Sequence, residues 1–134
     1  MNVTAAVGQA MLDAVKPLCN GGTLVFYTGT KPTNPDTAIS SQTVLATWTF
    51  AATAYGSDSL TGGAEQATGT FVTNPVTPSA NGTVGFARIF ETGGTTVVCD
   101  LSVGTSGTDI VIGTTTVNTT IPITMTDVLK MPVD

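Results

Sequence analysis

Threonine is the residue that most constrains the fold of this chain, because it accounts for 28 of the 134 residues. Its side chain branches at Cβ and therefore fits a pleated, half-buried strand surface better than a helix. The same sequence contains no histidine, which is the commonest general base and metal ligand near neutral pH. The composition therefore favours an all-β protein that acts through contacts at its surface, and it argues against an enzyme.

The length and the charge of the chain limit the number of domains and the classes of partner that we expect. A chain of 134 residues fits a single domain, 1–134, with 41% hydrophobic residues to form its core. Only 10% of the residues are charged, and the net charge is −5. Nucleic acids and anionic membranes are bound by clustered lysine and arginine, so we expect neither as a partner. The N-terminus lacks a basic first region and is a poor signal peptide.

The first segment is expected to be the only helix, over about residues 4–19. Thr4 can cap it, and Asn20-Gly21-Gly22 can end it. Apolar side chains recur inside it at helical spacing, at Val7, Met11, Ala14, Val15 and Leu18. We expect this apolar face either to pack on the rest of its own domain or to dock on a neighbouring subunit.

The remainder, about 22–134, is typical of strands and turns. Short alternating or β-branched segments predict strands at 23–28, 43–50, 68–72, 83–90, 95–102, 109–112, 115–119 and 120–125, with a further one at 128–131. Residues 51–64, which carry three glycines, are predicted to form an irregular loop. About eight short strands with frequent turns indicate an antiparallel β-sandwich or barrel with one short N-terminal α-helix.

The clearest hairpin joins 83–90 to 95–102 through Gly93-Gly94. A two-residue turn there would place Phe90 opposite Val97 and Arg88 opposite Cys99, whereas a four-residue turn would shift the register.

Arg88 is the only arginine, and it lies in an apolar strand where an unpaired guanidinium would be costly. Asp100 and Glu91 are the nearest candidate partners within the chain. A contact across a subunit interface is the alternative.

The sequence contains no strong pattern of catalytic or metal-binding residues. The Gly104-Thr105-Ser106-Gly107 turn has no histidine to activate its serine. Asp100 and Asp109 flank that turn and could hold calcium, but they lack the spacing of an EF-hand loop. Cys19 and Cys99 are 80 residues apart and are expected to be reduced thiols. We therefore predict a non-enzymatic protein with no metal ion and no cofactor.

Several longer segments resemble a known family. They are VGQAMLDAV, then LVFYTGTKPTNPDTAISSQTVLATWTF, then GTVGFARIFETGGTTVVCDLSVGTSGTDIVI. The strongest matches are Tyr27-Thr28-Gly29-Thr30-Lys31-Pro32, the short pieces Asp36-Thr37-Ala38 and Leu45-Ala46-Thr47, and the segment from Ser102 to Asp109. Together the segments span most of the chain and resemble small virion proteins of tailed bacteriophages, of the head decoration (cement or minor capsid) type.

The resemblance implies a jelly-roll-like β-sandwich that binds the major capsid protein on the capsid exterior, after assembly in the bacterial cytoplasm. It also implies a homo-oligomer, for which we expect a trimer. The helix and the loops at 31–38 and 51–64 are the expected contact regions, and the expected interface residues are Val7, Met11, Val15, Lys31, Asp36, Tyr55 and Arg88.

Two other functions remain open at this point. The same domain could belong to the tail or a fibre of the virion. It could also be a carbohydrate-binding sandwich, for which Trp48, Tyr27 and Tyr55 are the only candidates for an aromatic platform. Trp48 alternates with apolar neighbours, so we expect it in the core.

Overall fold

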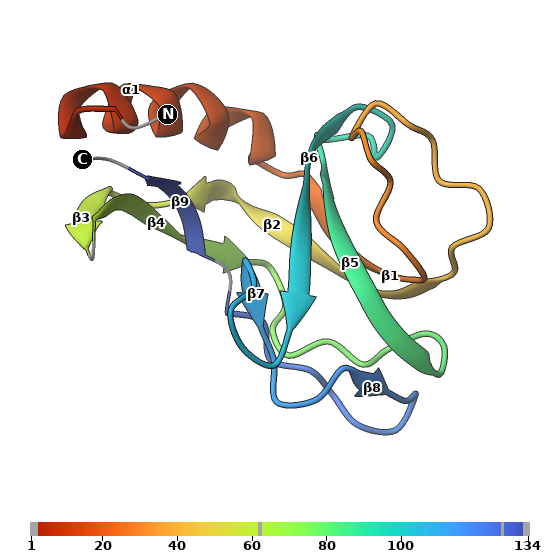
Figure 1. The fold of residues 1–134 in the computed structure, drawn as a ribbon. Coiled ribbons are helices and arrows are strands. Elements are labelled where there is room, and N and C mark those ends of the chain that lie inside the picture. Colours follow the sequence, from red (N-terminus) through yellow and green to blue (C-terminus); the bar gives the residue numbers. More distant parts are fainter. Residues whose placement is uncertain (1–2, 62, 127, 133–134) are drawn as a thin grey trace.

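The computed structural model describes residues 3–61, 63–126 and 128–132, and Figure 1 shows one helix beside a strongly curved sheet. The all-β class with a single N-terminal α-helix is confirmed. Helix α1 (Ala5–Val15) continues as the 3-10 helix η1 (Lys16–Cys19). The strands of the described part are β1 (Thr23–Thr28), β2 (Val44–Tyr55), β3 (Ser59–Thr61), β4 (Ala64–Phe71), β5 (Gly82–Phe90), β6 (Val97–Gly104), β7 (Ile110–Val111), β8 (Thr116–Val117) and β9 (Val128–Pro132).

The helical segment made by α1 and η1 together begins and ends where the sequence predicts, although the α-helix itself stops at Val15. The Thr4 hydroxyl accepts a hydrogen bond from the Val7 N–H at 3.3 Å, which satisfies one of the unpaired donors of the first turn. Pro17 lies in η1, where the tighter 3-10 geometry replaces the last α-helical turn. Gly21 then adopts φ +67°, a left-handed conformation that glycine adopts without steric cost.

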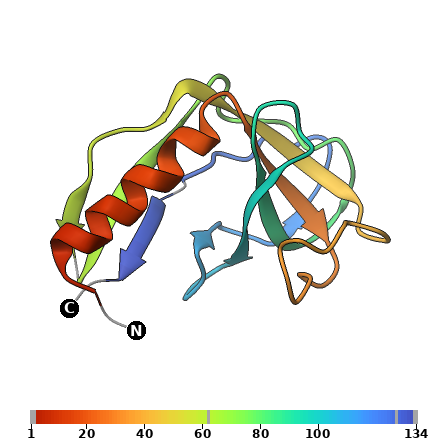
Figure 2. The same cartoon turned by 90° about the horizontal axis from the view of Figure 1, so that it is seen from above.

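The buried face of α1 differs from the predicted one. Its buried residues are Gly8 and Leu12, while Val7 and Leu18 are 47% and 46% exposed. The helix lies against β4 and β9 of its own domain, as Figure 2 shows. Gly8 and Leu12 are four residues apart and therefore lie on the same face of the helix, which is the face turned toward the sheet.

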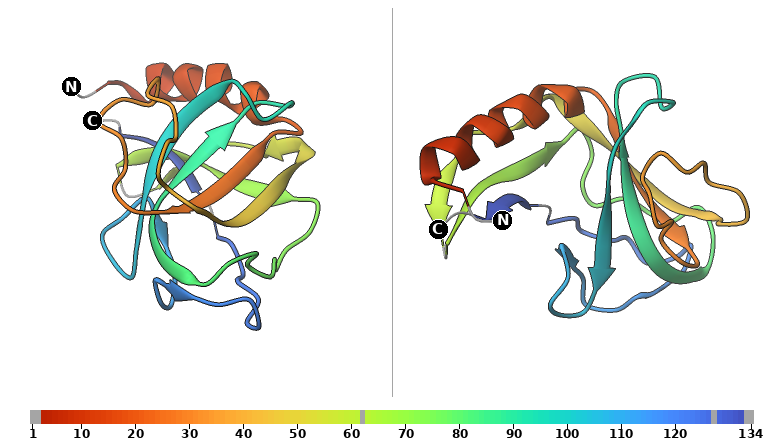
Figure 3. Two further views of the ribbon diagram at one scale, coloured as in Figure 1. Left: turned by 90° about the vertical axis from the view of Figure 1, so that its right-hand side faces the viewer. Right: turned by 45° about the horizontal axis from the view of Figure 1, so that its top comes forward.

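The strands follow one hydrogen-bonded path in the order β3-β4-β2-β1-β5-β6-β7, with β8 added to β5 and β9 added to β4. The named pairs are antiparallel, apart from the parallel pair of β6 and β7. Figure 3 shows how this path curls, so that α1, β4 and β9 stand apart from the β1-β5-β6 part. The jelly-roll-like sandwich stays a prediction.

The main core fills the inside of the curl. Trp48 is fully buried and meets Phe26 edge-on, with ring centroids 4.7 Å apart. Its indole N–H donates to Asn74 Oδ1 at 3.3 Å, so the one polar atom of the ring is satisfied. Phe50 packs between Tyr55 and Phe71, with centroids 5.4 and 4.9 Å away. The expectation that Trp48 belongs to the core is therefore confirmed.

Two predicted segments were wrong. Residues 51–64 are largely strand, because β2 runs on to Tyr55, which pairs with Gly69, and β3 follows at Ser59. The exposed side chains at 52 and 53 interrupt the apolar alternation, and this interruption hid the strand. Residues 120–125 form no strand, since Ile123 makes only an isolated bridge with Val76, next to Pro122, which has no N–H to donate.

The β5–β6 register combines a correct and an incorrect prediction. Phe90 lies opposite Val97 as predicted, but a bulge follows, and Ile89 then pairs with Cys99. This shift moves Arg88 from Cys99 to Asp100. The bulge is thus the local feature that brings the arginine directly opposite a carboxylate.

Candidate interaction surface

The feature that stands out on the outer face of the sheet is the long connection between β1 and β2, residues 29–43, which we call the 29–43 loop. A second, smaller core lies beneath it, made by Val25, Tyr27 and Phe86 with Ile39 and Phe90 packed against them. The rings of Tyr27 and Phe86 are stacked, with centroids 5.3 Å apart. The loop is therefore anchored on an apolar base through Ile39.

Arg88 and Asp100 form the polar centre of this anchor. The guanidinium binds the carboxylate with two parallel hydrogen bonds, from Nε to Oδ1 at 2.5 Å and from a terminal nitrogen to Oδ2 at 2.9 Å. The other terminal nitrogen donates to the carbonyl oxygen of Thr37 at 2.8 Å. The two side chains are only 1% and 3% exposed. One buried ion pair thus joins two strands of the sheet to the middle of the loop, and the prediction of an intramolecular Asp100 partner is confirmed.

The electrostatics of the anchor follow from burial and pairing. The hydrogen bond with Asp100 raises the pKa of Arg88 above its already high ordinary value. Burial raises the pKa of the nearby Tyr27 phenol, because the phenolate would lose its hydration. Both groups therefore keep a fixed charge state at neutral pH.

Hydrogen bonds within the 29–43 loop fix its shape further. Asn34 Oδ1 accepts from the Asp36 N–H at 2.8 Å, and the Thr37 N–H donates to the Asn34 carbonyl at 2.9 Å. At the other end, Gln42 Nε2 donates to the Thr30 carbonyl at 3.1 Å. The loop therefore presents a preorganised backbone, in which the entropy cost of ordering has already been met on folding.

Two glycines allow the loop to leave β1 across β5. A Cβ built on Gly85 would lie 1.7 Å from the carbonyl oxygen of Gly29, which is far inside van der Waals contact. Gly29 itself has φ +82°. The close crossing needs the missing side chain at Gly85, and the turn needs the conformational freedom of Gly29.

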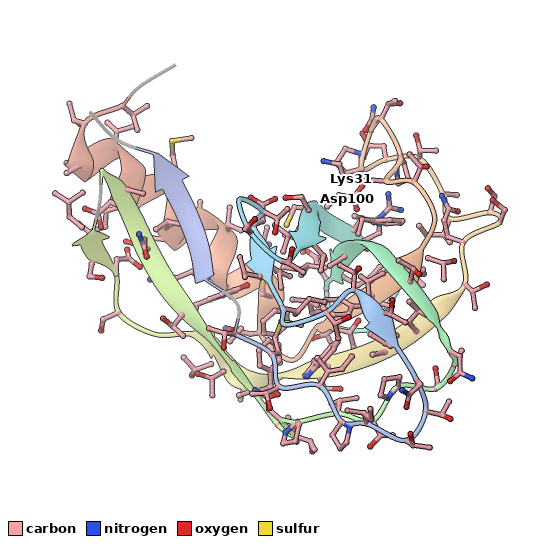
Figure 4. The ribbon with its side chains drawn as sticks, turned by 60° about the horizontal axis from the view of Figure 1, so that its bottom comes forward. Lys31 and Asp100 are labelled. Atoms are coloured by element: carbon pink, nitrogen blue, oxygen red, sulfur yellow. The ribbon has the colours of Figure 1, made fainter. Side chains whose placement is uncertain are left out.

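The predicted interface residues fall into separate places. Lys31 and Asp36 are exposed on the 29–43 loop, and Figure 4 shows Lys31 on the same side of the molecule as Asp100. Arg88 lies buried beneath them. Tyr55 is 4% exposed and belongs to the main core. The helix residues lie on α1, away from the loop, where Val7 is exposed and Met11 and Val15 are half-buried.

Sequence reasoning missed the contribution of Thr37, whose backbone carbonyl holds Arg88. Every residue has a backbone carbonyl, so the type of residue at position 37 gives no sign of this contact. The only available signal was the single arginine within an apolar strand.

A groove of about 350 Å³ lies elsewhere, along the threonine-rich segment that includes β7 and β8. It is lined by Val111, Ile112, Gly113, Thr114, Thr116, Val117, Asn118, Ile121, Pro122, Ile123 and Thr124. Two of its apolar residues, Val111 and Ile121, are 51% and 61% exposed. None of the lining residues carries a charge.

A small ion cluster closes the end of the helix. Lys16 Nζ pairs with Asp58 and, at 3.0 Å, with Asp13, and it donates to the Gly56 carbonyl at 3.1 Å. The hydrogen bond with Asp58 raises the pKa of Lys16. This cluster ties α1 to the β2–β3 connection.

The residues that were considered from the sequence as a calcium site or a sugar-binding platform are held in place by other contacts within the fold. Asp109 Oδ2 accepts from the N–H and the hydroxyl of Ser102 at 2.9 and 3.0 Å, while Asp100 is held by Arg88. Within the residues that the structure describes, no three His, Cys, Asp or Glu side chains gather as a metal site. The candidate aromatic platform is not at the surface, since Trp48, Tyr27 and Tyr55 are at most 6% exposed.

The cysteines and the helix give two further observations. Cys19 is buried and Cys99 half-buried, and both are thiols in the structure. No helix in the described ranges is long and apolar enough to cross a membrane.

Comparison with known proteins adds no relative. No protein-family model matches the chain. No curated protein matches it, and no solved structure does so either.

Proposed function

We propose that this protein is a non-enzymatic structural component of a tailed-bacteriophage particle, which binds the major capsid lattice from outside as a head decoration protein. The observation that carries the proposal is the 29–43 loop, a projecting surface held rigid by a buried ion pair. The resemblance of Tyr27–Pro32 and of the 102–109 segment to decoration proteins supports the same conclusion.

The chemistry of the loop suits a repeated, mostly polar contact. Its exposed side chains are mostly hydroxyls, with the amide of Asn34, the small apolar residues Pro35 and Ala38, and Lys31 and Asp36 as one charge of each sign. Because the loop is already ordered, little conformational entropy is lost on binding. Many copies on one shell would make each weak contact effective, since simultaneous attachment raises the apparent affinity.

Binding to capsids provides the direct test. Purified protein is mixed with expanded heads that lack it, and bound copies are counted after sedimentation and located by cryo-electron microscopy. We expect density over the capsid lattice, with the 29–43 loop at the contact. Density at the tail and none on the head would favour the tail or fibre alternative and overturn the proposal.

A matched pair of variants tests the contact itself. Lys31→Ser combined with Asp36→Ser should lower the number of bound copies, whereas Ile121→Thr, which changes an exposed residue of the groove, should not. If both variants bind as many copies as the parent chain, the 29–43 loop is not part of the contact with the capsid. Glycan binding by the pure protein, with no attachment to heads, would favour the carbohydrate-binding alternative.

A further inference from the structure

Helix α1 carries more apolar surface than its own domain covers. Gln9 and Asp13 are the only polar side chains in α1. A helix that is apolar nearly all round is typically buried on more than one side. In the part of the chain that the structure describes, α1 meets the sheet through β4 and β9, and its buried residues are Gly8 and Leu12 on one face. The rest of its apolar surface is left uncovered.

This uncovered surface forms a continuous row beside the buried face. Val7, Ala10 and Ala14 recur at i, i+3 and i+7 and therefore line one side of the helix, and Leu18 of η1 extends the row by one turn. Val7 and Leu18 are 47% and 46% exposed, and both alanines are exposed as well. Figure 2 shows α1 at the outside of the molecule. We call these four residues, with the half-buried Met11 beside them, the outer seam.

The outer seam carries no charge, which favours a second copy of the same chain as its partner. The net charge of the chain is −5, so two copies repel each other over much of their surface. The acidic residue of α1, Asp13, is paired with Lys16 at 3.0 Å. A two-fold contact places each residue near residues of its own kind. The seam is therefore a face on which two copies can meet without repulsion between like charges.

The sizes of the seam residues also suit pairing of the seam with itself. When two seams pack antiparallel around an axis between residues 12 and 13, Val7 lies opposite Leu18 of the second copy, and Met11 lies opposite Ala14. The long side chain of Met11 thus meets a small residue, and symmetry repeats each contact twice. Alanine at positions 10 and 14 lets the helix axes approach to about 8 Å, the close end of ordinary helix packing.

We propose that the outer seam of α1 pairs antiparallel with the outer seam of a second copy of this chain, around that two-fold axis. The inference goes beyond the proposed function and does not depend on it, and a two-fold pair takes the place of the trimer expected from the resemblance. The contact spans about three helical turns, which is less than the roughly 1,200–2,000 Å² of stable interfaces. We therefore expect a dissociation constant of about 10–100 µM, and stronger pairing where many copies are held on one surface.

Sedimentation equilibrium tests the pairing. Over protein concentrations on both sides of the expected constant, the average mass should rise from 13.5 kDa towards twice that mass. Ala14→Glu puts two carboxylates into the contact, one from each copy, and should raise the dissociation constant at least about tenfold. Gln9→Glu is the matched control, because it adds the same charge to an exposed position of the same helix outside the seam, and it should leave the constant unchanged. Circular dichroism checks that both variants are folded.

Cross-linking tests the antiparallel arrangement. Val7→Cys and Leu18→Cys are made in separate chains that also carry Cys99→Ser, because Cys99 is a half-buried thiol. Copper(II) phenanthroline accepts the two electrons that are released when two thiols form a disulfide and lose their protons to water. It should link a mixture of the two chains but neither chain alone, because the two copies of residue 7 lie roughly 16 Å apart along the axis. Links formed by each chain alone would indicate parallel helices and overturn the proposed pairing.

Failure of this inference can be told from failure of the proposed function. A chain that stays monomeric over the whole concentration series, or a dimer in which Ala14→Glu behaves as Gln9→Glu does, overturns the pairing, even if that protein binds heads. If the chain is monomeric and Ala14→Glu lowers the number of copies bound to heads, the capsid covers the seam, and the pairing is overturned. A dimer that Ala14→Glu weakens and that cross-links only in the mixture upholds the pairing, even if it does not bind heads.

Discussion

The buried pair of Arg88 and Asp100 offers the sharpest prediction about this fold. Asp100→Ala leaves a guanidinium that is 1% exposed and that has lost its carboxylate partner, while it still donates to the Thr37 carbonyl. Removing one member of a buried ion pair costs about 3–5 kcal/mol, because the other charge stays desolvated. Since small domains are stable by about 5–15 kcal/mol, this single change should remove a large part of the free energy of unfolding.

The double variant separates pairing from burial. Arg88→Met with Asp100→Leu removes both charges and keeps apolar volume in their place, so no charge is left desolvated. Its main loss is the hydrogen bond to Thr37, worth about 1 kcal/mol. We therefore expect the double variant to be more stable than Asp100→Ala. Asp36→Ala, at an exposed carboxylate of the same loop, should change stability by at most about 0.5 kcal/mol.

Two assays report the effect. Urea unfolding can be followed by the fluorescence of Trp48, the only tryptophan, which is fully buried. Thermolysin cleaves before large apolar residues, so cleavage before Ile39, the apolar anchor of the 29–43 loop, reports release of that loop, and it should be faster in Asp100→Ala than in the parent chain. If the double variant is as unstable as the single one, or if Asp100→Ala costs less than about 1 kcal/mol, the reasoning about the anchor is refuted.

Three further predictions concern other parts of the fold. Gly85→Ala should cost about 1–3 kcal/mol through backbone overpacking, measured by urea unfolding, whereas Gly113→Ala, with no atom within 4 Å of the added Cβ, should be neutral. Leu12→Ala should lower the free energy of unfolding by about 2–5 kcal/mol, and Val7→Ala by at most about 0.5 kcal/mol; equal losses would contradict the observed helix face. The raised pKa of Lys16 predicts stability that is complete below pH 10.5 and falls as the pH rises further, and Lys16→Met should remove part of that alkaline loss in pH-dependent unfolding.

The sequence predicts local structure well where one residue type decides it. β1 was predicted with its observed bounds, and Thr4 caps the helix, because an apolar β-branched run and a hydroxyl before a helix each act within a few residues. The helix face was misjudged, since Gly8 and Leu12 are its buried residues and which face is buried depends on how the helix lies on β4 and β9, a tertiary arrangement. The end of β2 was missed because its apolar alternation is interrupted at residues 52 and 53, and its strand conformation there depends on pairing with β4, which is a tertiary contact.

The candidate surface could be predicted only in part. The isolated arginine indicated a buried pair, and Asp100 was among its candidate partners. The bulge beside Ile89 and the carbonyl of Thr37 could not be foreseen, because both are set by backbone geometry. Lys31 and Asp36 were placed in an exposed loop correctly, but nothing in the sequence showed that this loop is fastened to the sheet.

The pairing of β4 with β9 has a consequence for how the chain is made. Ala64 pairs with Pro132, and α1 lies against both strands. During synthesis the helix and β4 leave the ribosome well before β9, and contacts so distant in sequence form slowly. Until β9 arrives, β4 exposes a strand edge that can join another nascent chain. We therefore expect products that stop before residue 128 to aggregate, although they contain most of the core.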